Sequence, residues 1–244
     1  MIRVEHLHKR FGEVTAVDDV SFVAPDGAVT GLLGHNGAGK TTTLRMLYGL
    51  MRPDAGRILV DDVDAVAAPQ DAQARLGVLP DVSGLYPRLT PREHIHYYGE
   101  LQGLSRARIL ARADEQVHIL DMTAIADRRT AGFSHGERTK VAIARALVHD
   151  PRNVLLDEPT NGLDVMSTRA VRDIIRRLRA DGRTVVFSSH VMQEVSALCD
   201  AIVIMAHGRI VAAGSPDALR RQTGHESLED AFVALTGLHA GEGA

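Results

Sequence analysis

The sequence has no long hydrophobic run. Its longest apolar stretch is AIVIMA (201–206), whereas an α-helix needs about 20 apolar residues to cross a membrane. The first ten residues, MIRVEHLHKR, alternate apolar with charged side chains and lack the apolar centre of a secretory signal. We therefore expect a cytoplasmic chain, and any membrane function would require another polypeptide to span the bilayer.

Cysteine and excess positive charge are also scarce. Cys199 is the only cysteine, so no disulfide can form within the chain, in agreement with a reducing compartment. The formal net charge is -3 and the isoelectric point is near 6.5, whereas nucleic-acid-binding domains carry a clearly basic face. We therefore expect no nucleic-acid partner. No low-complexity tract and no repeat with a solenoid period is evident.

What the chain does contain is enough apolar material for a substantial core. It has 244 residues, 45% of them hydrophobic, sufficient for one large domain or two small ones. Among 28 basic residues, only Lys9, Lys40 and Lys140 are lysines. A chain that otherwise uses arginine suggests a specific reason for each of these lysines.

The pattern of apolar residues predicts an α/β fold. Alternation over 2–7 and 17–27 indicates an antiparallel sheet at the start of the chain. A continuous apolar strand over 28–34 then leads through a glycine-rich loop into a helix over 43–50. Further strands are expected at 57–62, 75–80, 153–157, 184–189 and 201–206, and helices at 166–180, 191–199 and 227–237. Such alternation predicts a mostly parallel sheet with helices on its faces.

The middle of the chain has a different pattern. From Pro91 to about His149, apolar residues recur every three or four positions, which is typical of helices. We predict an α-helical subdomain inserted at 82–149 into a single domain that covers 1–238. A flexible tail is expected at 239–244.

The glycine-rich loop GHNGAGKTT (34–42) matches the phosphate-binding pattern G-x-x-x-x-G-K-[ST] between a strand and a helix. Glycines allow consecutive backbone N–H groups to converge on phosphates, Lys40 reaches the β and γ phosphates, and the Thr41 hydroxyl coordinates Mg²⁺. An ordinary glycine-rich turn is the alternative, and the flanking elements disfavour it. The expected nucleotide-binding residues here are Gly34, Asn36, Gly37, Ala38, Gly39, Lys40, Thr41 and Thr42.

Two carboxylates end the apolar segment NVLLDE. Asp157 and Glu158 would lie at the carboxyl edge of a parallel strand, where open α/β sheets bind ligands. We predict that Asp157 holds Mg²⁺ and that Glu158 orients or deprotonates the attacking water. The alternative is a pair of helix-capping acids, which the phosphate loop makes less favourable.

A histidine follows the next predicted strand, in FSSH. His190 would reach the same sheet edge and contact the γ phosphate, although a lone histidine often has only a structural role. His94 and His96 are two positions apart on a helix and cannot share a face, so they do not form a metal site. A ligand pair of His190 with Glu194 is disfavoured.

The segment FSHGERTK (133–140) opens a predicted helix with short polar residues. Ser134 and Glu137 have the spacing of a capping box. The same helix N-terminus, with its free N–H groups and hydroxyl, could instead hold an anion.

Together, GHNGAGKTT, FSHGERTKVAIARAL, NVLLDEPTNGLD and FSSH, in this order, resemble the ATP-binding subunits of ABC transporters over essentially the whole chain. The segments GVLPDVSGLYPRLTPREHI and SLEDAFVALTG most resemble the exporter class that includes the NatA-type sodium-efflux subunits. The resemblance implies a Mg²⁺-dependent ATPase that powers export, with sodium efflux as one candidate. It also implies a homodimer joined through its nucleotide sites and a separate integral membrane permease, with this chain peripheral on the cytoplasmic face of the inner membrane.

The resemblance also assigns roles to single residues. Ser134 and the Gly136 backbone would clamp the γ phosphate bound at Lys40 of the partner subunit. Phe11 would stack on adenine, although from the residues alone it looks like an ordinary core side chain. Asp164 would link the two sites across the dimer, and Asp81 occupies the place of a glutamine that senses Mg²⁺, water and the membrane partner.

Three residues depart from the family pattern. Asp81 is an anion in place of a neutral amide, and we expect it still to contact the metal or its water. His135 replaces a usual glycine and, when protonated, would strengthen the clamp on the γ phosphate. Glu137 replaces a usual glutamine, which a helix N-terminus tolerates.

Two classes of protein other than a transporter subunit share part of this pattern. A soluble ABC-type ATPase that drives a non-transport process would use the same site, but such proteins commonly carry two cassettes or a long coiled-coil insertion, which this chain lacks. A P-loop kinase or GTPase leaves the signature segment unexplained. The cargo stays open among sodium, a drug, a lipid and a polysaccharide.

Overall fold

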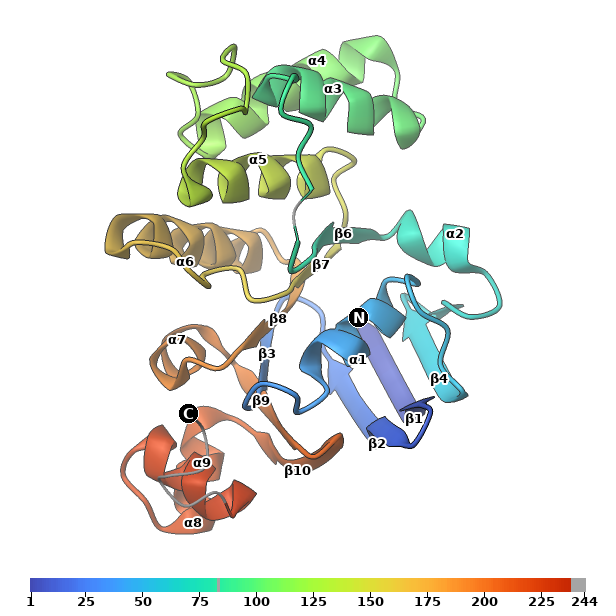
Figure 1. The fold of residues 1–244 in the computed structure, drawn as a ribbon, viewed down its shortest axis with the longest axis vertical. Coiled ribbons are helices and arrows are strands. Elements are labelled where there is room, and N and C mark those ends of the chain that lie inside the picture. The colour runs from blue at the N-terminus through green and yellow to red at the C-terminus, as the bar shows by residue number, and fades with distance from the viewer. Residues whose placement is uncertain (83, 238–244) are drawn as a thin grey trace.

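The computed structural model describes residues 1–82 and 84–237, and Figure 1 shows their arrangement. The flexible tail predicted at 239–244 lies outside the described residues. Within them, no helix combines the length and the apolar character needed to cross a membrane.

The predicted antiparallel sheet at the start of the chain is confirmed. Its four strands have the order β2-β1-β4-β5, and every neighbouring pair is antiparallel. The strands are β1 (Ile2–Phe11), β2 (Val14–Ala24), β4 (Ala55–Val60) and β5 (Val63–Asp64).

The second sheet is mostly parallel, also as predicted. Its order is β10-β9-β3-β8-β7-β6, and only the edge strand β10 runs antiparallel to its neighbour. The strands are β3 (Val29–Leu33), β6 (Leu76–Leu79), β7 (Asn153–Leu156), β8 (Thr184–Ser189), β9 (Ala201–Ala206) and β10 (Arg209–Gly214). Strands β3, β7 and β8 are buried along their whole length, which explains their continuous apolar runs.

The described residues also form helices. They are α1 (Lys40–Leu47), α2 (Pro69–Gln73), α3 (Pro91–Leu101), α4 (Arg106–Ile119), α5 (His135–Leu147), α6 (Val165–Ala180), α7 (Met192–Leu198), α8 (Pro216–Thr223) and α9 (Leu228–Thr236). Helices α3, α4 and α5 gather at one end of the molecule (Figure 1), within the segment predicted as a helical insertion. The sequence pattern does not indicate β5, α2, α8 or β10.

Alternate residues of the parallel strands face two separate apolar clusters. On β8, Val186 packs in a cluster with α1 and the antiparallel sheet, whereas Val185 and Phe187 pack in a second cluster with α5, α6 and α7. On β7, Leu155 and Leu156 divide in the same way. This two-residue period is expected for a sheet covered on both faces. Because both faces of the sheet are covered, the carboxyl ends of β3, β7 and β8 form the edge on which a site can form.

Candidate active site

The loop between β3 and α1 is shaped by glycines. Gly39 has a φ of +102°, and a Cβ there would lie 2.6 Å from the carbonyl oxygen of Ala16. A Cβ on Gly34 would lie 2.5 Å from the carbonyl oxygen of Met205. No side chain caps the N-terminus of α1, so its N–H groups stay available for an anion.

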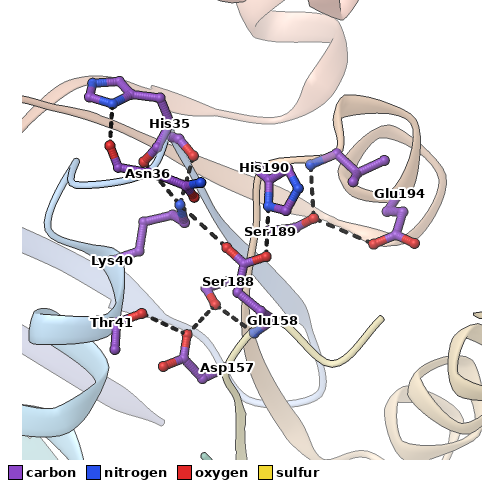
Figure 2. Close-up of polar contacts among 12 residues, drawn as sticks. His35, Asn36, Lys40, Thr41, Asp157, Glu158, Ser188, Ser189, His190 and Glu194 are labelled. Carbon is purple, nitrogen blue, oxygen red and sulfur yellow. Dashed lines mark hydrogen bonds and ion pairs between the residues drawn. The ribbon is translucent and has the colours of Figure 1, made fainter. Parts of the chain in front are cut away.

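Lys40 is the first residue of α1 and is almost fully buried, at 5% exposure. Its Nζ donates to the carbonyl oxygens of Gly34 at 2.7 Å and His35 at 3.1 Å, and lies 3.4 Å from Oε1 of Glu158. The ammonium group therefore sits at the centre of the loop, where Figure 2 shows it beside the Glu158 carboxylate.

Asp157 follows β7 and is 2% exposed. Its Oδ1 accepts hydrogen bonds from Thr41 Oγ1 at 3.2 Å and Ser188 Oγ at 2.6 Å. Burial raises the pKa of the Asp157 carboxyl, while the bonds from Ser188 and Thr41 act in the opposite direction. Its Oδ2 is buried and has no hydrogen-bond partner among the described residues. A cation beside Oδ2 and the Thr41 hydroxyl would resolve this, so the two residues fit a Mg²⁺ site.

Glu158 joins the predicted catalytic residues. Its Oε1 lies next to Lys40, and its Oε2 is 2.7 Å from Nδ1 of His190. Its backbone N–H donates to Ser188 Oγ at 2.8 Å, and its φ is +48°, a left-handed conformation that a non-glycine residue seldom adopts and that often marks functional sites. The structure thus brings Lys40, Glu158 and His190 together, as the sequence predicted (Figure 2).

Ser188 was missed by the sequence analysis. Its hydroxyl donates to Asp157 and accepts from the Glu158 N–H, so it positions both acids. The sequence signal for Ser188 was a hydroxyl near the end of an apolar strand, two residues before His190.

Phe11 is 47% exposed, so its interpretation as an ordinary core side chain is wrong. It lines a cavity of about 580 Å³ together with Gly37, Lys40, Thr41 and Glu158. An exposed aromatic ring beside the phosphate loop can stack on a planar base.

Asp81 does not contact Thr41 or Asp157 in this structure. Its Oδ2 instead lies 2.9 Å from Nη2 of Arg45, one helical turn after Thr41 on α1. The Asp81 charge is still close enough to contribute to the raised pKa of Asp157.

The segment around Ser134 forms the predicted capping box. Ser134 Oγ accepts from the Glu137 N–H at 3.2 Å, and the Ser134 N–H donates to Glu137 Oε2 at 2.8 Å. Gly136 is packed so closely that a Cβ would lie 2.3 Å from Oγ of Ser167. Neither Ser134 nor Gly136 lines the cavity that contains Lys40.

Two further predicted residues lie beside this segment. His135 is exposed, and its Nε2 lies 3.1 Å from the carbonyl oxygen of Asn161. Asp164 caps α6 and accepts from the N–H and hydroxyl of Ser167, at 2.9 and 2.8 Å. Ser167 thus connects Asp164 with Gly136, and the two predicted cross-dimer segments are neighbours in one chain.

His190 and Glu194, the disfavoured metal-ligand pair, contact different residues. The His190 ring contacts Glu158, while Glu194 contacts Thr160 and Arg172. In the described part of the chain, no three or more His, Cys, Asp and Glu side chains cluster in a way that would hold a metal ion.

Comparisons with known proteins identify similar sequences and a similar structure. The family model described as ABC transporter matches residues 17–161. The chain is 43% identical over 239 residues to the ABC transporter ATP-binding protein NatA of Bacillus subtilis (strain 168), covering 96% of this chain and 97% of the relative. It is 38% identical to the Nod factor export ATP-binding protein I of Paraburkholderia xenovorans (strain LB400), covering 89% and 72%. A solved structure of an ATP-binding subunit of an ABC transporter superimposes with a TM-score of 0.88 at 30% identity, covering 96% and 99%.

Proposed function

Since the chain belongs to the ABC transporter family, as an ATP-binding subunit, we propose that it powers export through a separate integral membrane permease. The chain is an ATPase that uses Mg²⁺. One observation carries the proposed catalytic arrangement: Lys40, Glu158 and His190 form a continuous chain of contacts beside Asp157, at one edge of the parallel sheet.

The contacts suggest how each residue acts in hydrolysis. The N-terminus of α1 and Lys40 would bind the β and γ phosphates. Thr41 and Asp157 would hold Mg²⁺, which would supply positive charge to neutralise part of the phosphate charge. Because Lys40 also contacts Glu158, moving the ammonium group toward the γ phosphate would free one carboxylate oxygen. Glu158 then orients the attacking water for in-line displacement, and His190 holds the other carboxylate oxygen.

We also propose that two copies complete each other's sites. Ser134 is exposed at the start of α5 but does not line the cavity of Lys40, so in this proposal its hydroxyl acts on nucleotide bound to another copy. In the homodimer, the N-terminus of α5 and the Ser134 hydroxyl would clamp the γ phosphate held by Lys40 of the partner subunit. Phe11 would stack on adenine, and Asp164 would link the two sites.

The permease contact is proposed at a different cavity. This cavity, of about 640 Å³, includes Asp81, Arg45, Tyr48, Leu50 and His149 in its lining. Nδ1 of His149 in its lining is buried and has no hydrogen-bond partner among the described residues. Buried polar atoms normally have partners, so a polar segment of another chain fits here, and the resemblance places the sensor of the membrane subunit at Asp81.

Export is the direction we propose, supported by the similarity to a protein named for Nod factor export. Sodium is the first cargo to test. The alternative is a soluble ABC-type ATPase that drives a non-transport process.

The test of a transporter function begins with purification from the native cells. The tagged chain is extracted from gently solubilised membranes, and we expect a polytopic membrane protein to copurify in stoichiometric amount. The complex is then reconstituted into vesicles, and ATP-dependent sodium flux is measured. A stoichiometric soluble partner, or a chain found wholly in the cytosolic fraction, would favour the non-transport alternative.

The catalytic assignment is tested by Glu158→Gln. We expect this variant to bind ATP without hydrolysing it, and to accumulate as a dimer in light scattering with Mg-ATP. Residual hydrolysis close to the wild-type rate would contradict the role of Glu158.

A further inference from the structure

Glu194 is a charged side chain that the fold buries. It lies on α7, four residues after His190, and is only 3% exposed. Charged residues are almost never buried to this extent unless they are paired, and none of the catalytic roles described above uses this carboxylate. Its contacts therefore indicate what it does.

The Glu194 carboxylate connects three segments that surround the site. Its Oε2 accepts from the Thr160 hydroxyl at 2.5 Å and, over a longer 3.4 Å, from the Ser189 hydroxyl. Its Oε1 accepts from Nη2 of Arg172 at 3.2 Å. Thr160 follows Glu158 by two residues, Ser189 directly precedes His190, and Arg172 lies on α6, so one buried group holds both catalytic segments against the same helix.

The backbone around His190 is fixed through the same group. Ser189 Oγ accepts from the Val191 N–H at 3.0 Å while it donates to Glu194. Figure 2 shows Ser189 between His190 and the Glu194 carboxylate. The residues on both sides of His190 are thereby tied together, which limits where its ring can lie.

Glu158 also depends on this support. Its φ of +48° is a conformation that persists only when its surroundings hold it in place. On one side the Ser188 hydroxyl binds its N–H. Beyond it in the chain, the Thr160 hydroxyl is held by Glu194. Loss of that hold would let the segment after Glu158 relax and move its carboxylate away from His190.

We propose that Glu194 is a positioning residue of the ATPase site, which fixes Glu158 and His190 relative to each other by holding Thr160 and Ser189. It does not touch the nucleotide cavity. The inference rests on the catalytic roles proposed for Glu158 and His190.

The experiment measures kcat, KM and thermal unfolding of the full chain for Glu194→Gln and for two variants at Thr160, which donates a hydrogen bond to Glu194. Thr160→Val removes the hydroxyl at nearly constant volume, and Thr160→Ser retains it. We expect Glu194→Gln and Thr160→Val to lower kcat by about 10-fold or more, because a small displacement of catalytic groups is costly. ATP affinity, measured by equilibrium binding in the Glu158→Gln background, should change by less than about 2-fold, since the loss concerns the transition state. Thr160→Ser should keep a kcat near that of the wild type.

A matched control is Glu115→Gln, which removes a carboxylate that pairs with Arg112 on α4, 2.6 Å away and far along the chain from the site. This variant should leave kcat and ATP affinity unchanged. The inference is overturned if Glu194→Gln and Thr160→Val both keep a wild-type kcat, or if kcat falls only in proportion to the folded fraction at the assay temperature. Hydrolysis that persists in Glu158→Gln would instead reject the catalytic roles themselves.

Discussion

Single acidic residues at this site differ in how they are held. Asp157 is buried with one oxygen unpaired, Glu158 bridges a lysine and a histidine, and Asp81 is paired with Arg45 near the surface. These environments agree with the roles proposed for Asp157 as a metal ligand and for Glu158 as the group that orients water. Asp81 differs most from the expectation, because its carboxylate pairs with Arg45. A metal ion would have to compete with Arg45 for this carboxylate.

Replacing Asp81 tests whether it serves the metal. We expect Asp81→Asn to raise the Mg²⁺ concentration for half-maximal ATPase by about 5-fold, because a partly solvated charge a few ångströms away contributes ~1 kcal/mol. The measurement is a Mg²⁺ titration of ATPase rate at saturating ATP. Asp71→Asn, at an exposed carboxylate of α2, is the control and should have no effect. If half-saturation is the same in Asp81→Asn and wild type, Asp81 only holds Arg45.

At the scale of elements, the helices begin in different ways. Helix α1, whose N-terminus is proposed to bind phosphate, begins at a left-handed glycine without a side-chain cap, whereas α3 and α5 both begin with complete capping boxes. An uncapped N-terminus suits an anion that comes and goes. A capped one is stable by itself, and at α5 the capping hydroxyl is also the group proposed to clamp the partner's nucleotide.

The two capping boxes allow stability and catalysis to be separated. Thr90 Oγ1 accepts from Glu93 N–H at 3.2 Å on α3, the same distance as in the Ser134 box on α5. We expect Ser134→Ala and Thr90→Ala each to lower the free energy of unfolding by about 1 kcal/mol. Urea melts and ATPase rates of both variants provide the comparison.

Only the Ser134 variant should lose most of its ATPase activity, because only Ser134 is proposed to reach the partner's γ phosphate. Equal activity in the two variants would show that Ser134 is a helix cap and nothing more.

At the scale of the whole molecule, we expect the buried His94 and the half-buried His149 to make stability depend on pH. Nε2 of His94 accepts a hydrogen bond from the Tyr86 N–H, and Nδ1 of His94 lies 2.9 Å from the Thr90 carbonyl oxygen. The neutral imidazole therefore holds the loop before α3. Burial, together with the positive charge of Arg145, lowers the pKa of His94 below its ordinary value, and burial likewise lowers that of His149.

The sign of the effect follows from the protons bound. Below pH ~6.5 the unfolded histidines take up protons that the folded ones do not, so the free energy of unfolding should fall as pH drops from 7 to 5. Each histidine contributes at most ~1.4 kcal/mol per pH unit. Urea melts at pH 7, 6 and 5 measure this slope, and His94→Gln, which cannot titrate, should make it shallower.

Carboxylates act in a separate pH range. The Arg183 guanidinium beside Asp150 lowers the pKa of that carboxyl, so its stabilisation is lost only as pH falls below the ordinary aspartate range near 4.

A slope between pH 7 and 5 that is identical in wild type and His94→Gln would show that His94 is not a source of the pH dependence.

The parts of this protein that depend on neighbours along the chain can be predicted from the sequence. The phosphate loop, the acids after β7, the capping box at Ser134 and the alternation of strands with helices all follow from local spacing and backbone preference. The short elements α2 and α8 and the edge strand β10 were missed, because none carries a strong enough local pattern to be distinguished from loop.

Which side chains meet depends on the three-dimensional fold. The contacts of Ser188 with Asp157, of Asp81 with Arg45, and of Glu194 with Thr160 join residues that are 31, 36 and 34 positions apart. Strand order brings such residues together, and strand order depends on which apolar faces pack in three dimensions. The exposure of a side chain depends on the same packing. Whether Phe11 lies in the core or is exposed, and so able to stack on a base, therefore followed only from the whole fold.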